Sequence, residues 1–156
     1  MTKVTDGKLS AWWANREHEP ACSCRIVCDA EVVSALDVVD ETFVAAPPAV
    51  VAARMAGPGR WRRWWPDLRL TVLHDRGPEG VRWTVTGGLR GTLEIWLEPV
   101  LDGTVLHLFL RSELPAGTDV GAELARRRRQ AKAMAFELKA DLEAGRAAGE
   151  PPVPGP

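Results

Sequence analysis

One long β-hairpin limits what this chain can fold into more than any other feature of its sequence. Between residues 89 and 114, apolar and polar side chains alternate with a period of two, which is typical of strands that bury one face. Asp102-Gly103 lies midway and is a favoured dipeptide for a two-residue type I′ turn. Such a turn pairs residues whose numbers sum to 205, so the sequence predicts both the hairpin and its register.

The predicted register gives the hairpin two chemically different faces. The first matches opposite charges and aromatic rings, in the pairs Glu94 with Arg111, Trp96 with Phe109, and Glu98 with His107. The second face is aliphatic, with Leu97 opposite Leu108 and Ile95 opposite Leu110, and it also holds Leu93 and Leu106.

Burial decides which face looks inward. Removing apolar surface from water contributes about 25 cal/mol per Å², which favours an inward leucine face and an outward charged face. The opposite orientation stays open, because an oligomer could cover the leucines. In that case Glu94 and Arg111, beside Trp96 and Phe109, would supply the polar groups of a ligand site, and His107 would titrate near neutrality.

A strand and two short helices are predicted ahead of the hairpin. Residues 36–44 are rich in Val and Thr and favour a strand, and Pro47-Pro48 opens a helix that Gly57-Pro58-Gly59 ends. A second short helical turn would place Trp61 and Trp64 or Trp65 on one face. Residues 68–75 and 81–86 are predicted to be extended.

A long amphipathic helix is predicted from about residue 120 to Ala144. Its buried stripe is expected to be Leu124, Ala131, Ala135, Leu138 and Leu142. The sequence therefore predicts an α+β fold, with a sheet of about five strands and a long C-terminal helix.

These elements resemble the helix-grip fold of the START-like (SRPBCC, polyketide cyclase/dehydrase) superfamily over residues 36–144. The residues that carry the resemblance are Val44-Ala45-Ala46-Pro47-Pro48, Trp61-Arg62-Arg63-Trp64-Trp65-Pro66, Gly91-Thr92-Leu93-Glu94-Ile95-Trp96-Leu97-Glu98-Pro99 and Asp102-Gly103-Thr104. The resemblance implies a curved antiparallel sheet of about five to seven strands around the helix, with an apolar cavity between them. Members usually have seven strands, so a shorter sheet implies a smaller cavity.

Tryptophan is over-used, with seven Trp against three Phe and no Tyr. Large flat side chains suit both ligand stacking and core packing. The residues expected to contact a ligand are Trp64, Trp65, Trp83, Trp96 and Phe109. Packing is the alternative for Trp64 and Trp65, and Trp83 is expected to point inward because it shares a face with Val81 and Val85.

Three parts are predicted along the chain. Residues 1–35 lack sustained periodicity and are expected to be a poorly ordered extension, with a translation start near Val33 as one hypothesis. Residues 36–145 form the domain. Residues 146–156, rich in Pro and Gly, are expected to be a disordered tail.

Charge and composition argue against several classes of partner. The net charge of −1 and the absence of interleaved aromatics make the run of four arginines at 126–129 a solvated helix surface, although Arg127 or Arg128 could turn inward toward an anion. We expect no nucleic acid partner, no membrane span and a cytoplasmic protein. Cys22, Cys24 and Cys28 suit neither a disulfide framework nor, with His18, a zinc site, so no metal or cofactor is expected.

Three functions remain open. The leading hypothesis is a carrier, without enzymatic activity, for a small apolar or aromatic molecule of a lipid or polyketide-like kind. An alternative is a cyclase or dehydratase in which His107, Glu94 and Arg111 transfer protons and stabilise an oxyanion. The third is an interaction module that forms a homodimer through its sheet.

Overall fold

A computed structural model describes residues 35–146 and 150–151 of the chain. The elements follow the order β1 (Ala35–Val44), α1 (Pro48–Met55), α2 (Pro58–Trp64), β2 (Leu68–Asp75), the 3₁₀ turn η1 (Gly77–Glu79), β3 (Gly80–Gly87), β4 (Arg90–Val100), β5 (Gly103–Glu113) and α3 (Val120–Leu142). The predicted order is confirmed. The predicted extension, the Val33 start and most of the predicted tail lie outside the described residues.

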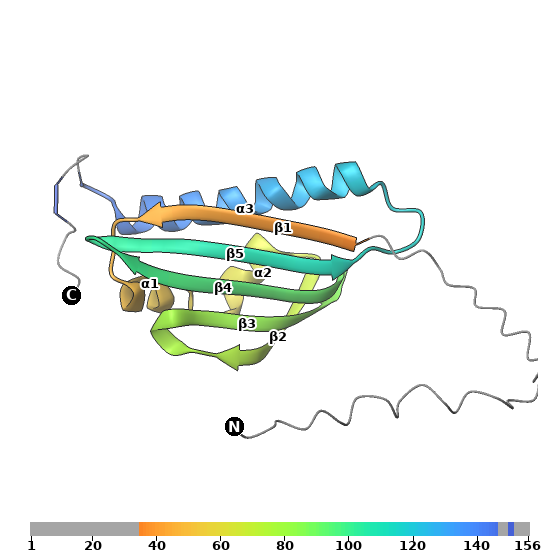
Figure 1. Ribbon diagram of the computed structural model, residues 1–156, viewed down its shortest axis with the longest axis horizontal. Coiled ribbons are helices and arrows are strands. Elements are labelled where there is room, and N and C mark those ends of the chain that lie inside the picture. The colour runs from red at the N-terminus through yellow and green to blue at the C-terminus, as the bar shows by residue number, and fades with distance from the viewer. Residues whose placement is uncertain (1–34, 147–149, 152–156) are drawn as a thin grey trace, which may run out of the picture.

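The five strands form one antiparallel sheet in the order β1-β5-β4-β3-β2. The helices α1 and α2 lie behind this sheet in the view of Figure 1, and α3 runs alongside β1. The other broad face of the sheet has no helix over it (Figure 1). The α+β prediction, with a curved sheet of five strands and a long C-terminal helix, is confirmed.

The leucine face of the hairpin looks toward the helices. Its six aliphatic side chains are at most 1% exposed, and they form the core with residues from every other strand and all three helices. The outward orientation of the charged face is therefore confirmed, and the alternative in which that face lines an internal cavity is wrong. Burial of the larger apolar area decides the orientation, as expected.

The predicted register of the hairpin is wrong by two residues. Val100 pairs with Gly103, so Leu101 and Asp102 form the turn, and Leu101 takes the left-handed conformation with φ 52°. Gly103 belongs to β5, where a Cβ would lie 2.5 Å from both the Phe43 ring and the Val44 carbonyl oxygen. Packing against β1, and not turn preference, therefore requires this glycine.

The shift of two residues changes the cross-strand partners but not the faces, because side chains alternate with a period of two. The observed pairs are Glu94 with Phe109, Trp96 with His107, Glu98 with Val105, Leu97 with Leu106, and Ile95 with Leu108.

The helix α3 starts where its sequence provides a cap. Asp119 accepts a hydrogen bond from the Ala122 backbone N–H at 3.0 Å, which satisfies one of the free donors of the first turn. Farther along, Lys132 and Lys139 donate to the Glu41 and Phe43 carbonyl oxygens, both at 3.1 Å. Lysine side chains therefore bond the outward-facing carbonyl oxygens of the edge strand β1, which protects that edge of the sheet from pairing with another strand.

Candidate functional site

An inner cavity of about 600 Å³ lies between α1, α2 and the inner face of β2, β3 and β4. Its larger apolar lining side chains are Met55, Trp61, Leu70, Val81, Trp83 and Leu97. No residue of α3 lines it among those that the structure describes. The prediction of an apolar cavity between the sheet and the C-terminal helix is thus corrected in position, because the short helices α1 and α2 form its roof.

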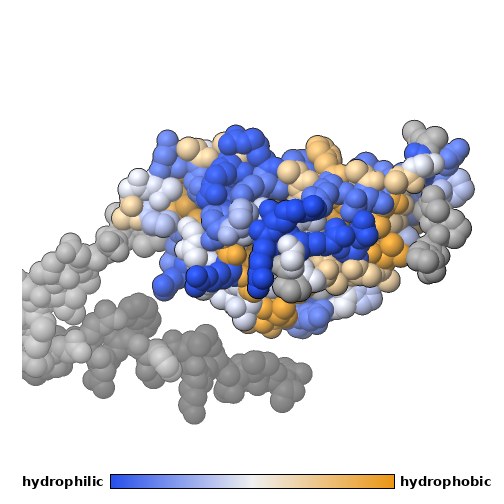
Figure 2. Space-filling view, turned by 180° about the vertical axis from the view of Figure 1, so that it is seen from behind, coloured by the Kyte–Doolittle hydropathy of each residue, from blue (hydrophilic) through white to orange (hydrophobic). Residues whose placement is uncertain are grey.

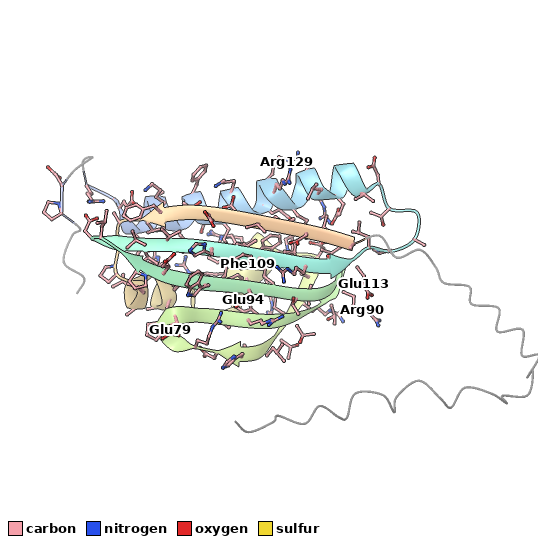
Figure 3. The ribbon with its side chains drawn as sticks, viewed as in Figure 1. Glu79, Arg90, Glu94, Phe109, Glu113 and Arg129 are labelled. Carbon is pink, nitrogen blue, oxygen red and sulfur yellow. The ribbon has the colours of Figure 1, made fainter. Side chains whose placement is uncertain are left out.

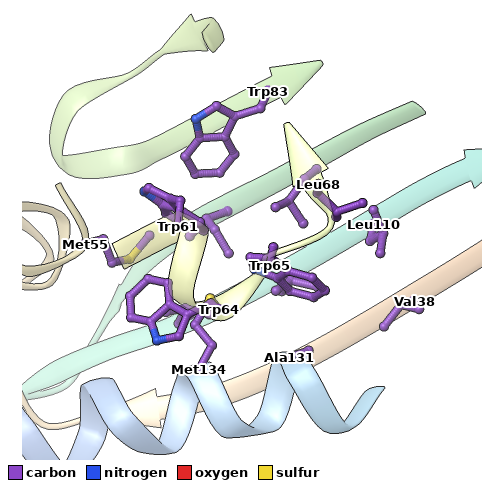
Figure 4. Packing of buried hydrophobic residues seen from close by; sticks show 14 of the residues in the cluster. Val38, Met55, Trp61, Trp64, Trp65, Leu68, Trp83, Leu110, Ala131 and Met134 are labelled. Atoms are coloured by element: carbon purple, nitrogen blue, oxygen red, sulfur yellow. The ribbon is translucent and has the colours of Figure 1, made fainter. Parts of the chain in front are cut away.

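Two tryptophans from different elements form one wall of the inner cavity. Trp61 comes from α2 and Trp83 from β3, and their ring centroids lie 4.3 Å apart at a tilt of 56°. Figure 4 shows Trp61 between Trp83 and Trp64, which meets it edge-on at 5.2 Å. The inward position predicted for Trp83 is confirmed, since it is 5% exposed.

Trp64 and Trp65 lie away from the wall of the inner cavity. The Trp64 indole donates to Glu137 Oε2 on α3 at 2.9 Å, and Trp65 is fully buried beside the Arg127 guanidinium, 5.9 Å from the ring centroid. These two side chains hold α2 against α3, which is the packing role weighed for them. Their predicted contact with a ligand has no support in this geometry.

The mouth of the inner cavity lies between β2 and the corner where α1 meets α2. The lining residues that are exposed all come from this region or from the turn after β2; they are Ala56, Gly57, Arg62, Arg69, Val72, Asp75 and Gly77. Since β2 is an edge strand, no further strand of residues 35–146 closes this side.

A buried ion network lies at the other end of α2. Arg127 on α3 is fully buried and makes a two-pronged contact with Asp67, at 3.0 Å and 2.5 Å, while its Nε donates to Glu123 at 2.7 Å. Arg126 reaches the same two carboxylates, at 3.0 Å and 2.7 Å. The inward turn considered for Arg127 is therefore real, but the anion it meets is a side chain of the protein.

The arginines lower the pKa of both carboxyls in this network. Burial alone would raise the pKa of Asp67, but the hydrogen bonds from Arg127 and Arg126 outweigh it and hold the pKa below its ordinary value. For Glu123 the hydrogen bond from Arg126 is the largest cause, and its pKa is lowered as well. Both groups are thus stabilised as carboxylates, which suits a structural link more than proton transfer.

The predicted candidates on the hairpin lie on the outer face of the sheet. Glu94 and Phe109 project from the side that the helices leave uncovered (Figure 3). There they form an outer depression of about 260 Å³; its lining residues are Arg76, Arg82, Thr92, Glu94, Trp96, Phe109 and Arg111. Glu94 contacts Arg76 at 2.5 Å, whereas Arg111 pairs only loosely with Asp37, at 3.7 Å.

His107 is enclosed on this outer face and has no free ring nitrogen. Its Nδ1 lies 3.1 Å from Glu41 and its Nε2 lies 2.9 Å from Glu98, while the Trp96 ring stacks on it at 4.5 Å. Both nitrogens already have carboxylate partners, so the ring is not poised to exchange a proton with a ligand. The structure does not bring His107, Glu94 and Arg111 together as a catalytic set around a cavity.

Sequence reasoning missed two features of the site. Trp61 was not among the predicted ligand contacts, although it lines the inner cavity. Arg127 was left out of the predicted stripe of α3, although it precedes Ala131, Met134 and Leu138 at helical spacing. The helical spacing of these residues would have indicated that Arg127 belongs to the buried stripe.

Metal and membrane features are limited in the described residues. Within residues 35–146 and 150–151, no group of three His, Cys, Asp or Glu side chains is placed to hold a metal ion. His18 and the three cysteines lie outside this range. No described helix combines the length and the apolar character that crossing a membrane requires.

Comparison with known proteins gives structural relatives but no sequence relatives. No protein-family profile and no curated protein matches the chain. The Aha1 dimer protein of Colwellia psychrerythraea is similar with a TM-score of 0.55 and 16% identity, over 72% of this chain and 99% of that chain. Protein MLL2253 of Mesorhizobium loti gives 0.59 and 16%, over 71% and 99%.

A third similar structure is DynU16, a protein of the dynemicin biosynthetic locus, with a TM-score of 0.51 and 19% identity, over 70% of this chain and 48% of that chain. At these identities the likeness concerns the fold, and it agrees with the element order and the sheet topology described above. The chain therefore has a helix-grip fold.

Proposed function

We propose that this protein binds a small apolar or aromatic molecule in the inner cavity between α1, α2 and β2–β4. The observation that carries the proposal is a cavity of about 600 Å³ whose walls are mainly aliphatic and aromatic. This volume falls within the range of about 300–1,000 Å³ that is typical of small-molecule sites. The indoles of Trp61 and Trp83 offer rigid apolar surface that a flat ligand can stack on.

A pair of substitutions on α1 tests the proposal. Ala52 lines the inner cavity, whereas its neighbour Ala53 is exposed and does not line it. Ala52→Phe should fill the cavity and weaken binding at least tenfold, and Ala53→Phe should leave binding unchanged. Binding is measured by calorimetry with a panel of fatty acids, sterols and polycyclic aromatics, and a negative heat-capacity change is expected because apolar surface is buried. If no member of the panel binds at micromolar concentration, the proposal fails.

The open edge of the sheet supports a second function, association of two copies through β2. Val72 and Leu73 are 58% and 59% exposed on this edge strand. In Figure 2 hydrophobic residues gather at the lower margin of the molecule, where Figure 1 places β2. Edge strands with exposed apolar side chains favour pairing with another strand, and β2 lacks the lysines that cover β1.

Charge complementarity along β2 favours antiparallel pairing with the β2 strand of a second copy. β2 carries Arg69 near its start and Asp75 at its end, so antiparallel pairing brings opposite charges together and parallel pairing brings like charges together. A register shift between Val72 and His74 places a bulge in the strand, so the edge is regular from Leu68 to Val72 and resumes at His74 and Asp75. The similar Aha1 protein is itself a dimer, which agrees with this arrangement but does not specify its interface.

Two lysine variants, one on β2 and one on β1, test whether β2 forms the interface. Val72→Lys should abolish the dimer, because it places a charge on the regular part of the pairing edge. Val39→Lys should not, because Val39 has a similar exposure of 53% but lies on the opposite edge strand. Light scattering over a wide concentration range gives the oligomeric state. A wild-type chain that remains monomeric throughout rules out the dimer.

A further inference from the structure

Among the residues that the structure describes, the indole N–H groups of Trp61 and Trp83 have no hydrogen-bond partner. Both side chains line the inner cavity and are 9% and 5% exposed. Neither N–H donates a hydrogen bond within the described residues, and neither is among the fully enclosed polar atoms that lack a partner, so both keep some accessible surface, in side chains that line the cavity. By contrast, the Trp64 N–H donates to Glu137, and the Trp65 N–H is enclosed.

The side chains around the inner cavity offer donors and almost no acceptors. Indole and guanidinium groups only donate, and they come from the two tryptophans and from Arg62 and Arg69. Asp75 is the single acceptor among the lining side chains, and its Oδ1 already receives the Gly77 backbone N–H at 2.8 Å. A ligand that complements the polar side chains of this wall therefore carries a hydrogen-bond acceptor.

A ligand that displaces water from the indoles must replace the water's hydrogen bonds or leave the donors unpaired. Leaving one buried donor without a partner weakens binding by about 5- to 150-fold. A purely hydrocarbon ligand carries this cost twice, once for each indole. A ligand with a carbonyl oxygen between the two rings avoids it and keeps the apolar contacts.

We propose that the ligand of the inner cavity is an apolar ring compound that carries a carbonyl oxygen, a ketone, quinone or lactone, and that this oxygen accepts a hydrogen bond from Trp61, Trp83 or both. The inference rests on the proposed function, since it names the chemical class of the molecule that the same cavity takes. Figure 4 shows the two indoles next to each other.

A matched pair of probes, 9-fluorenone and fluorene, tests the role of the carbonyl, because the two molecules share one ring skeleton. Calorimetry on the full chain should show fluorenone binding about 5- to 150-fold more tightly than fluorene. Trp61→Phe and Trp83→Phe keep an aromatic ring and remove the N–H. The two changes together should abolish the preference by tightening the binding of fluorene relative to that of fluorenone, because no indole N–H is then left unpaired.

Trp64→Phe is the control, because it also removes one indole but not one that lines the inner cavity. It should keep the preference for fluorenone. As a direct readout, one or two of the seven tryptophan indole N–H proton resonances should shift downfield with fluorenone and not with fluorene, and the Phe variants should assign them to Trp61, Trp83 or both.

The outcomes separate this inference from the function on which it rests. Equal affinity for both probes, or a preference that survives in the double variant, overturns the carbonyl proposal and leaves apolar binding in place. Failure of both probes and of the wider ligand panel overturns both proposals together.

Discussion

Replacing Arg127 by methionine should destabilise the domain more than any change on the exposed side of α3. The guanidinium is fully buried and joins three partners on two sides: Asp67 before β2, and Glu123 and Gln130 within α3. Methionine has a comparable length and fills the space beside Trp65, so the change removes the charge and its hydrogen bonds more than the packing.

The expected magnitude follows from what the substitution leaves behind. Removing one partner of a buried ion pair costs about 3–5 kcal/mol, because the other charge loses its compensation. Asp67 keeps the Arg126 contact at 3.0 Å and is about one-third exposed, which places the expected loss at the lower end, about 3 kcal/mol. This is a large part of the 5–15 kcal/mol that is typical of a single domain.

Urea unfolding followed by tryptophan fluorescence measures the loss. With a slope of about 1–3 kcal/mol per M, the midpoint should fall by about 1–3 M. Arg128→Met is the matched control on the exposed side of the same turn and should change the free energy of unfolding by less than about 0.5 kcal/mol. In an Asp67→Asn background the effect of Arg127→Met should shrink. Equal effects in both backgrounds would refute the coupling of these two residues.

Three further predictions concern the core, the hairpin and acid stability. Leu108→Ala should lower the free energy of unfolding by about 2–5 kcal/mol, as measured by urea titration. The control Leu101→Ala, at a side chain that is 98% exposed, should lower it by less than about 0.5 kcal/mol. Gly91→Ala should lower the thermal midpoint, because its Cβ would lie 2.1 Å from the Arg111 carbonyl oxygen, whereas Gly59→Ala, with no atom within 4 Å, should not. Finally, the pKa values of Asp67 and Glu123 are lowered from 3.8 and 4.5, so their stabilisation is complete above these values and is lost as the pH falls below them. Unfolding at pH 2–6 should show this loss, with a smaller slope in Asp67→Asn; an unchanged slope would contradict it.

The sequence was sufficient for what depends on local periodicity. The alternation from residue 89 to residue 114 placed the named hairpin side chains on the correct face, although the turn was misplaced by one residue and the pairing therefore shifted by two. An even shift preserves faces, so the error affected only the cross-strand partners. Its cause is long-range: Gly103 is held against Phe43 and Val44 of β1, which turn propensity cannot indicate.

The candidate site depended on contacts between distant parts of the chain and was predicted less well. Which tryptophans line the inner cavity is set by the way α2 lies across β3, and it selects Trp61 and Trp83 instead of Trp64 and Trp65. The predicted anion partner of Arg127 proved to be Asp67, which is 60 residues away in the chain. No local pattern connects these two residues before the fold is known.

The short sheet leaves the inner cavity open on one side. The space beneath α1 and α2 holds about 600 Å³. Because β2 ends the sheet, this space opens beside its exposed residues Arg69 and Val72. The enclosed volume therefore does not cap the length of a ligand, since a long molecule can leave one end in the mouth while its ring system lies between Trp61 and Trp83. A second copy paired along β2 would cover that mouth, so ligand length and dimerisation should compete, with bulky ligands favouring the monomer.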